Sequence, residues 1–165
     1  MESLVMWFTD TLGQYISREA VVFIISLLPV LECRGGLLAA SLLKVPLKVA
    51  IPICVAGNIL PIPFILLFIK KLLEWMKGTR LFKGFATWLE NRAQKRSGAV
   101  EASEFWGLVF FVGIPLPGTG AWTGSIIASL LELDIKKAVV CELLGVAIAT
   151  VIMSIVSYGL LGMIL

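Results

Sequence analysis

Four apolar stretches, separated by polar or glycine-rich breaks, organise the chain. They cover residues 20–43, 46–69, 105–131 and 138–165. A helix rises about 1.5 Å per residue and a bilayer core is about 30 Å thick, so about 20 apolar residues span a membrane once. The second and fourth stretches meet this length and are each predicted to form one crossing, the second kinked by Pro52, Pro61 and Pro63.

The first stretch is interrupted near its midpoint. The residues that interrupt it are charged or helix-breaking: Pro29, Glu32, Arg34, Gly35 and Gly36. The apolar arms on either side, residues 20–28 and 37–43, would as helices be roughly 10 to 14 Å long, about half of the hydrocarbon thickness. We therefore predict a re-entrant helical hairpin whose turn lies at mid-depth in the membrane.

The third stretch repeats this design. Its break, PLPGTGAWTG at residues 115–124, is even richer in Pro and Gly. Non-helical backbone at membrane depth persists only where protein or water satisfies its hydrogen-bonding groups. A second re-entrant hairpin is predicted here.

An internal repeat relates the two halves. Shifting the chain by 88 positions aligns Phe23–Gly57 with Phe111–Gly145 at eleven identities in 35 ungapped positions, among them Gly36 with Gly124. Each unit is one hairpin followed by one crossing, and the single crossing between the units puts the hairpins on opposite sides of the membrane. The predicted fold is thus an all-α polytopic membrane protein built as an inverted repeat.

Residues 70–104 join the two repeats and hold eight of the fourteen Lys and Arg. Their apolar positions recur at helical spacing, which predicts an amphipathic interfacial helix, and the basic excess places it in the cytoplasm with both termini outside. The expected organisation is one membrane domain: a surface segment at 1–19, repeat 1 at 20–69, the connector at 70–104 and repeat 2 at 105–165.

Composition agrees with a membrane location. Hydrophobic residues make up 59% of the chain and charged residues 15%, with a mean hydropathy of +0.98, whereas a soluble domain is about half apolar and a quarter charged. The N-terminus lacks the features of a removable signal peptide. We expect an integral protein of the cytoplasmic (inner) membrane of a prokaryote.

Enzymatic and nucleic-acid-binding functions are disfavoured. The chain has no histidine, and Cys33, Cys54 and Cys141 lie in apolar stretches without metal-ligand spacing. No Ser or Cys stands beside an evident base, and the basic residues are local to the connector. We therefore expect no enzyme, no cofactor, no metal and no nucleic-acid partner.

Glu32 and Arg34 are the strongest candidates for function. Ionisable groups at mid-membrane are costly and are kept mainly where they face a cavity, a partner or a transported species. The two could neutralise one another or a partner from the other repeat, or only pin the turn, and the protonation state of Glu32 stays open. Gly35 and Gly36 follow at the start of the second arm, where free backbone N–H groups and the positive helix end could receive an anion such as phosphate.

The second break adds uncharged candidates that would meet the first near the midplane and complete a substrate pathway. They are Pro115, Pro117, Gly118, Thr119, Gly120, Trp122 and Thr123. Asn58 is a further substrate contact, or caps backbone groups freed by the downstream prolines. Glu142 is a proton-coupling candidate together with Glu32, or lies near the interface in contact with water.

The segments LLPVLECRGG and FVGIPLPGTGAWTGS, with the intervening GN and its downstream prolines, resemble the small multi-drug export protein family. That family looks like a distant branch of the DedA superfamily, whose members are associated with two opposed re-entrant hairpins and with movement of lipid phosphates such as undecaprenyl phosphate. The resemblance places Glu32 at the acid of the first hairpin and Pro117-Gly118 at the break of the second. The arginines that flank the second break in those relatives are absent here, with Ile114 and Trp122 in the neighbourhood.

Three functions stay open at this point. The first is a transporter or flippase for a small amphipath, above all an anionic lipid phosphate, with possible proton coupling. The second is proton-coupled efflux of a small cation or drug. The third is a non-transporting membrane scaffold or assembly factor whose basic connector binds a partner or anionic lipid. Membrane lipids are expected partners, and the small interior predicts a homo-oligomer.

Overall fold

The computed structural model describes residues 17–79, 82–84, 86–88, 90–91, 94–95, 103–116 and 118–160. Most of the predicted N-terminal surface segment and much of the connector lie outside these residues. The described part is helical, without strands. Its elements are α2 (Arg18–Leu27), α3 (Glu32–Leu42), α4 (Leu47–Ile59), α5 (Pro61–Gly78), α7 (Glu104–Gly113), α8 (Ala121–Leu130), α9 (Ile135–Ser154) and the π-helix η1 (Ile155–Leu160).

Among the described residues, two helices are long and apolar enough to cross a membrane: Leu47–Gly78, formed by α4 and α5, and Ile135–Gly159, formed by α9 and most of η1. These match the two predicted crossings. Pro61 begins α5, and the junction stays helical because Leu60 still donates its N–H to the Ala56 carbonyl.

The first crossing continues further than the sequence predicted. It was expected to end at residue 69, yet α5 runs on to Gly78, so residues 70–78 continue this helix. The reason is a buried stripe at i, i+4 spacing, in which Ile65, Ile69 and Leu73 are at most 6% exposed. This stripe packs on the core with α8 and carries the helix past the first lysines.

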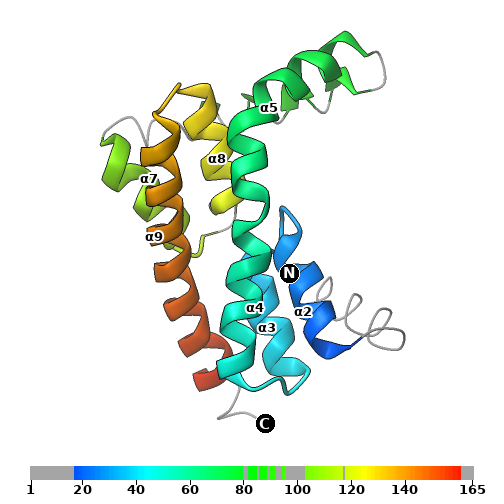
Figure 1. Cartoon of the computed structure of the whole chain (residues 1–165), viewed down its shortest axis with the longest axis vertical. Coiled ribbons are helices and arrows are strands. Elements are labelled where there is room, and N and C mark those ends of the chain that lie inside the picture. Colours follow the sequence, from blue (N-terminus) through cyan, green and yellow to red (C-terminus); the bar gives the residue numbers. More distant parts are fainter. Residues whose placement is uncertain are drawn as a thin grey trace.

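The remaining helices form two half-length pairs. α2 packs on α3, and α7 lies close to α8, with ten or eleven residues in each helix. In Figure 1 the α2–α3 pair lies beside the lower half of the long helices and the α7–α8 pair beside the upper half, with the two connecting turns facing each other at mid-height. We call these pairs the first and second hairpins.

The second arm of each hairpin begins earlier than predicted. α3 starts at Glu32 instead of residue 37, and α8 starts at Ala121, inside the predicted break. The first turns of α3 contain glycine because α2 approaches α3 too closely there to leave room for a side chain. A Cβ on Gly36 would lie 1.9 Å from the Ser26 hydroxyl of α2.

The same local geometry ends α3 and α8. Lys44 and Glu132, 88 positions apart, follow these helices with left-handed φ angles of 56° and 57°. The next residue donates back to the helix in both cases, Val45 to the Ala40 carbonyl at 2.9 Å and Leu133 to the Ala128 carbonyl at 3.0 Å. The hydrogen bonds therefore recur at the offset of the sequence repeat.

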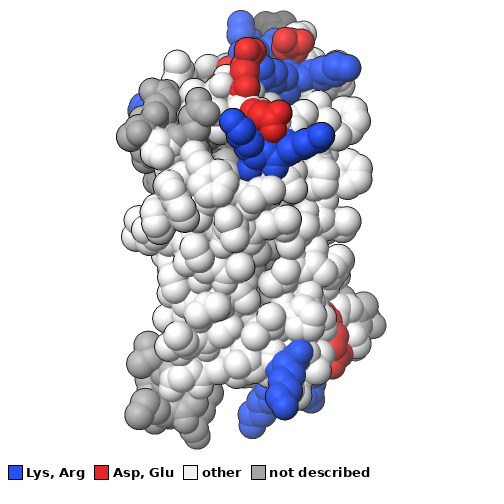
Figure 2. Space-filling model, turned by 60° about the vertical axis from the view of Figure 1, so that its left-hand side comes forward, with Lys and Arg blue, Asp and Glu red and all other residues white. Residues whose placement is uncertain are grey.

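The surface is that of a membrane protein. Figure 2 shows Lys, Arg, Asp and Glu gathered at the two ends of the visible face, with an uncharged belt between them. Large apolar side chains are exposed on the helices, including Phe64 at 61%, Val151 at 60% and Ile155 at 66%. So much exposed apolar area fits lipid contact and not solvent contact.

Candidate functional site

Arg34 joins the two turns. Its side chain reaches from α3 into the second break and is 7% exposed. Nη1 donates to the carbonyls of Leu116 at 2.9 Å and Thr119 at 2.8 Å. Nη2 donates to the carbonyls of Val112 at 3.1 Å and Ile114 at 3.3 Å, and to the Thr119 hydroxyl at 3.1 Å. The guanidinium thus satisfies carbonyls at the end of α7 and in the break, which hydrocarbon could not do.

Glu32 makes the complementary contact at the start of α8. Its side chain is 4% exposed and accepts from the backbone N–H of Ala121 at 3.2 Å and of Trp122 at 3.1 Å. A carboxylate at a helix N-terminus is favoured by unpaired N–H groups and by the helix dipole. Glu32 therefore caps α8 from the other hairpin.

A third contact closes the arrangement, because the indole N–H of Trp122 donates to the Leu27 carbonyl at the end of α2 at 3.2 Å. We call the contacts of Glu32, Arg34 and Trp122 across the two turns the turn–turn bridge. Each hairpin in this bridge satisfies helix ends of the other.

Backbone conformation shapes the bridge. Glu32 has a left-handed φ of 52°, and Gly120 has a φ of 137° with ψ near 180°. The Gly120 conformation is open almost only to glycine. A Cβ there would lie 2.1 Å from Glu32 Oε2, so Gly120 also leaves the space that the carboxyl fills.

The other predicted residues of the first hairpin have structural positions. The Gly35 N–H donates to the Leu31 carbonyl at 2.7 Å. This N–H is therefore not free to bind an anion, contrary to the prediction. A Cβ on Gly35 would meet Leu31 at 2.7 Å. Gly35 and Gly36 therefore permit close packing.

In the second break, Thr119 joins the bridge through its carbonyl and its hydroxyl, which lies 2.9 Å from the carbonyls of both Ile114 and Leu116. Gly118 supplies a left-handed turn with a φ of 77°. Pro115 and Thr123 are half-buried beside the bridge and make none of its contacts. Pro117 lies outside the described residues.

Glu142 is fully buried on α9, so the structure does not place it at a hydrated interface. Its Oε1 accepts from the Ser125 hydroxyl of α8 at 3.1 Å, while Oε2 has no partner among the described residues. Gly124 makes room for it, because a Cβ there would lie 2.9 Å from Oε1. Ser125 was not identified from the sequence. The signal for it was Gly124, which precedes Ser125, aligns with Gly36 in the repeat and indicates a close approach of two helices.

Asn58 is 1% exposed on α4, and its amide oxygen has no hydrogen-bond partner in the described part of the chain. Arg34 Nε is likewise buried without a partner there. No group of three or more metal-ligating His, Cys, Asp or Glu side chains occurs among the described residues.

Two apolar hollows flank the bridge. One, of about 450 Å³, runs along α5 from Leu60 to Leu72 and ends at Trp122. The other, of about 500 Å³, lies beside Phe110, Leu116 and Thr119 and reaches Lys95 of the connector. Each brings an apolar wall next to a residue that takes part in the bridge.

Fold and surface are those of a membrane protein: the described residues form two helices long and apolar enough to cross a membrane, and a buried, charged contact between two half-length hairpins. The chain matches the model of the family described as "Putative small multi-drug export protein" over residues 32–152. Because this is more than half of its 165 residues, the chain belongs to that family, whose description is consistent with a transporter. The match includes Glu32, Arg34, the whole second break and Glu142. The comparisons with curated proteins and with solved structures returned no match.

Proposed function

We propose that this protein is a transporter or flippase that moves a small amphipath, most specifically an anionic lipid phosphate such as undecaprenyl phosphate, between two re-entrant hairpins of an inverted repeat. The proposal includes a distant relation to the DedA superfamily, a prokaryotic inner-membrane location and assembly as a homo-oligomer. The family description and the apolar surface support the transporter class.

The observation that carries the proposal is the turn–turn bridge. Both of its charged side chains are almost completely buried, and each holds the opposite hairpin. Charges are kept at such depth mainly for function. The bridge is a closed gate that must open before anything passes between the hairpins.

An anion can open this gate by competition. Glu32 occupies the N–H groups at the α8 N-terminus, a position that suits phosphate equally well. A phosphate bound there would displace the carboxylate and pair with Arg34, whose guanidinium matches phosphate geometry. The apolar hollows beside Trp122 and Thr119 would hold the tail.

A proton can open it as well. Protonation of Glu32 removes the negative charge that accepts from Ala121 and Trp122, and hydrogen bonds to charged groups are worth about 1.5–3 kcal/mol against about 1 kcal/mol for neutral ones. Proton coupling through Glu32 would follow from this loss of strength.

The test is lipid-phosphate flipping in proteoliposomes with Glu32→Gln and Arg34→Lys. Glu19→Gln and Arg18→Lys are matched controls, because these residues belong to the exposed start of α2. We expect at least a tenfold loss in the bridge variants and normal rates in the controls. Wild-type flipping in both folded bridge variants would remove the proposed site.

A second candidate is proton-coupled efflux of a small cation or drug, favoured by the unpaired buried oxygen of Glu142. A carboxylate without a cationic partner attracts a cation or a proton. In this case resistance to cationic drugs would be lost with Glu142→Gln or Glu32→Gln and kept with Arg34→Lys, whereas transport of a phosphate bound at Arg34 would be lost with Arg34→Lys.

A further inference from the structure

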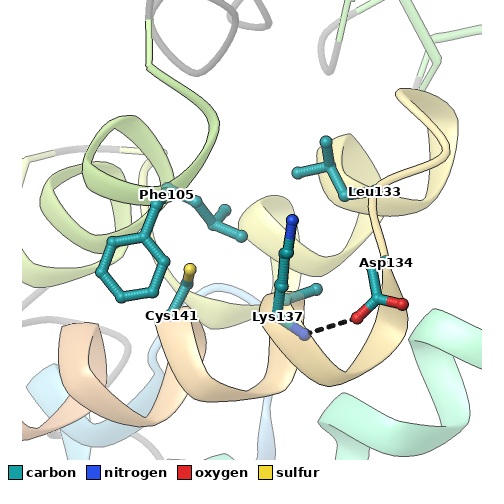
Figure 3. Close-up of a pocket in the computed structure, with 7 residues that line it drawn as sticks. Phe105, Leu133, Asp134, Lys137 and Cys141 are labelled. Atoms are coloured by element: carbon teal, nitrogen blue, oxygen red, sulfur yellow. Dashed lines mark hydrogen bonds between the residues drawn. The ribbon is translucent and has the colours of Figure 1, made fainter.

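A cavity opens beside the start of α9, next to the buried Glu142. It has a volume of about 400 Å³, and it is lined by Phe105 and Leu108 of α7, Leu133 and Asp134 before α9, and Lys137, Ala138 and Cys141 of α9. Figure 3 shows the Lys137 ammonium extending into this space, while the backbone N–H of Lys137 donates a hydrogen bond to the Asp134 carboxylate. We call it the Lys137 cavity.

Two of the residues that line this cavity, Ala138 and Leu108, lie near Glu142. Ala138 lies four residues before Glu142, on the same face of α9 and one helical turn away, about 5.4 Å along the axis. Leu108 lines the cavity and also approaches the position beside the carboxyl. Its Cδ1 and Glu142 Oε1 lie 3.3 and 2.9 Å from the same point, the position that a Cβ on Gly124 would occupy. Leu108 is itself completely buried.

Glu142 lacks a charge partner. The ion pairs among the described residues are Lys70–Glu132 and Lys77–Glu90, neither of which involves it. The groups that face it are the Ser125 hydroxyl from α8, Cys141 of its own helix and, at longer range, Glu32 of α3. A charged carboxylate without a cationic partner would be very costly in this setting.

We infer that the Lys137 cavity is the aqueous access route by which Glu142 exchanges its proton, with Leu108 as the barrier between them. In the exchange the Glu142 O–H bond breaks, the proton passes to water in the cavity and the carboxylate remains. The route opens at the end of the molecule that carries the Lys70–Glu132 pair and the basic connector, which the charge pattern predicts to be cytoplasmic. The inference rests on the proposed function only in one respect, namely that the exchanged proton is coupled to transport.

The experiment measures access to Glu142 in proteoliposomes. A water-soluble cationic carbodiimide is added on the connector side; it takes up the proton of a carboxyl group, whose oxygen then adds to its central carbon. Modification of Glu142 is followed by peptide mass, with Glu142→Gln as the blank. Leu108→Ala removes the barrier and should raise the rate about three- to tenfold. Val112→Ala is the matched control, because Val112 also touches the Gly124 position but does not border the cavity.

A second variant does not disturb the core. Lys137→Glu reverses the charge in the cavity, and Lys137 is exposed, so the fold should be kept. It should speed the cationic carbodiimide and slow an anionic methanethiosulfonate reagent at Cys141, measured after Cys33→Ala and Cys54→Ala. Equal rates in Leu108→Ala and Val112→Ala, no effect of Lys137→Glu, or faster modification from the opposite side would overturn the inference.

A transport assay distinguishes a failure of this inference from a failure of the proposed function. If Glu142 is modified as expected but no lipid phosphate moves in any assay, the access route stands and the proposed function falls. If flipping depends on Glu32 and Arg34 while both cavity variants leave modification unchanged, the function stands and the access route falls.

Discussion

Replacing Gly120 by Ala should break the turn–turn bridge from a residue that carries no functional group. A Cβ would lie 2.1 Å from Glu32 Oε2 and 2.6 Å from its Cδ, which is inside any allowed contact. The φ of 137° adds backbone strain. Strain of this kind costs about 1–3 kcal/mol, and displacing the carboxyl from two N–H groups costs at least about 2 kcal/mol more. We expect Gly120→Ala to lower the free energy of unfolding by roughly 3–5 kcal/mol.

The mechanism can be isolated with a double-mutant cycle. Glu32→Ala removes the carboxyl that the new methyl group would strike, so Gly120→Ala should cost about 1–3 kcal/mol less in that background than in the wild type. The assay is loss of helical circular dichroism in mixed micelles of dodecyl maltoside and increasing dodecyl sulfate. Gly84→Ala is the control, because a Cβ there meets nothing within 4 Å. If the costs of the two single substitutions add up to the cost of the double substitution within about 0.5 kcal/mol, the predicted clash between these two residues is refuted.

Three further outcomes are expected. Arg34→Ala should lower stability by about 3–5 kcal/mol because it strips a buried cation from carbonyls of the other hairpin, whereas Arg18→Ala, which loses one exposed contact, should cost under about 1 kcal/mol in the same unfolding assay. Glu142→Gln should change stability by under about 1 kcal/mol if the carboxyl is neutral, since an amide oxygen can still accept from Ser125; a clear stabilisation would mean that a charge had been buried. The Lys70 ammonium holds the pKa of the exposed Glu132 carboxyl below its ordinary value, so this pair stabilises above the unfolded-state pKa and the gain fades as acid protonates Glu132. A pH titration of stability should show a small slope there that Glu132→Gln removes.

The plan of the fold could be predicted from the sequence, because hydrophobic length and its interruption are properties of the chain alone. Two apolar runs of spanning length and two broken ones correspond to two long helices and two half-length pairs. The placement of those pairs in a bilayer as an inverted repeat stays a prediction, which the recurring geometry at Lys44 and Glu132 supports.

Boundaries failed where packing outweighed local propensity. Gly35 and Gly36 suggest a turn in sequence, but in the fold they let α3 approach Ser26 and Leu31, and the helix runs through them. The first lysine after the apolar run, Lys70, suggested a helix end, whereas burial of Leu73 continues α5 beyond it.

The partners of the charged site could not be predicted from side-chain types. Glu32 and Arg34 were expected to face each other or a residue of the other repeat, and they bind mostly backbone N–H and carbonyl groups of the second break. Nearly every residue carries such groups, so nothing in the sequence singles them out. The burial of Glu142 was hidden for a similar reason, since it depends on how closely α8 approaches α9 at Gly124.

The bridge also bears on how the chain is made. While only the first hairpin has left the ribosome, Glu32 and Arg34 have no carbonyls or amides from residues 112–122 to meet, and leaving them in hydrocarbon would be costly. The first hairpin should therefore wait at the membrane surface, or under the cover of an insertase, until the second arrives. Two fragments split within the connector should be unstable when expressed singly and recover when expressed together.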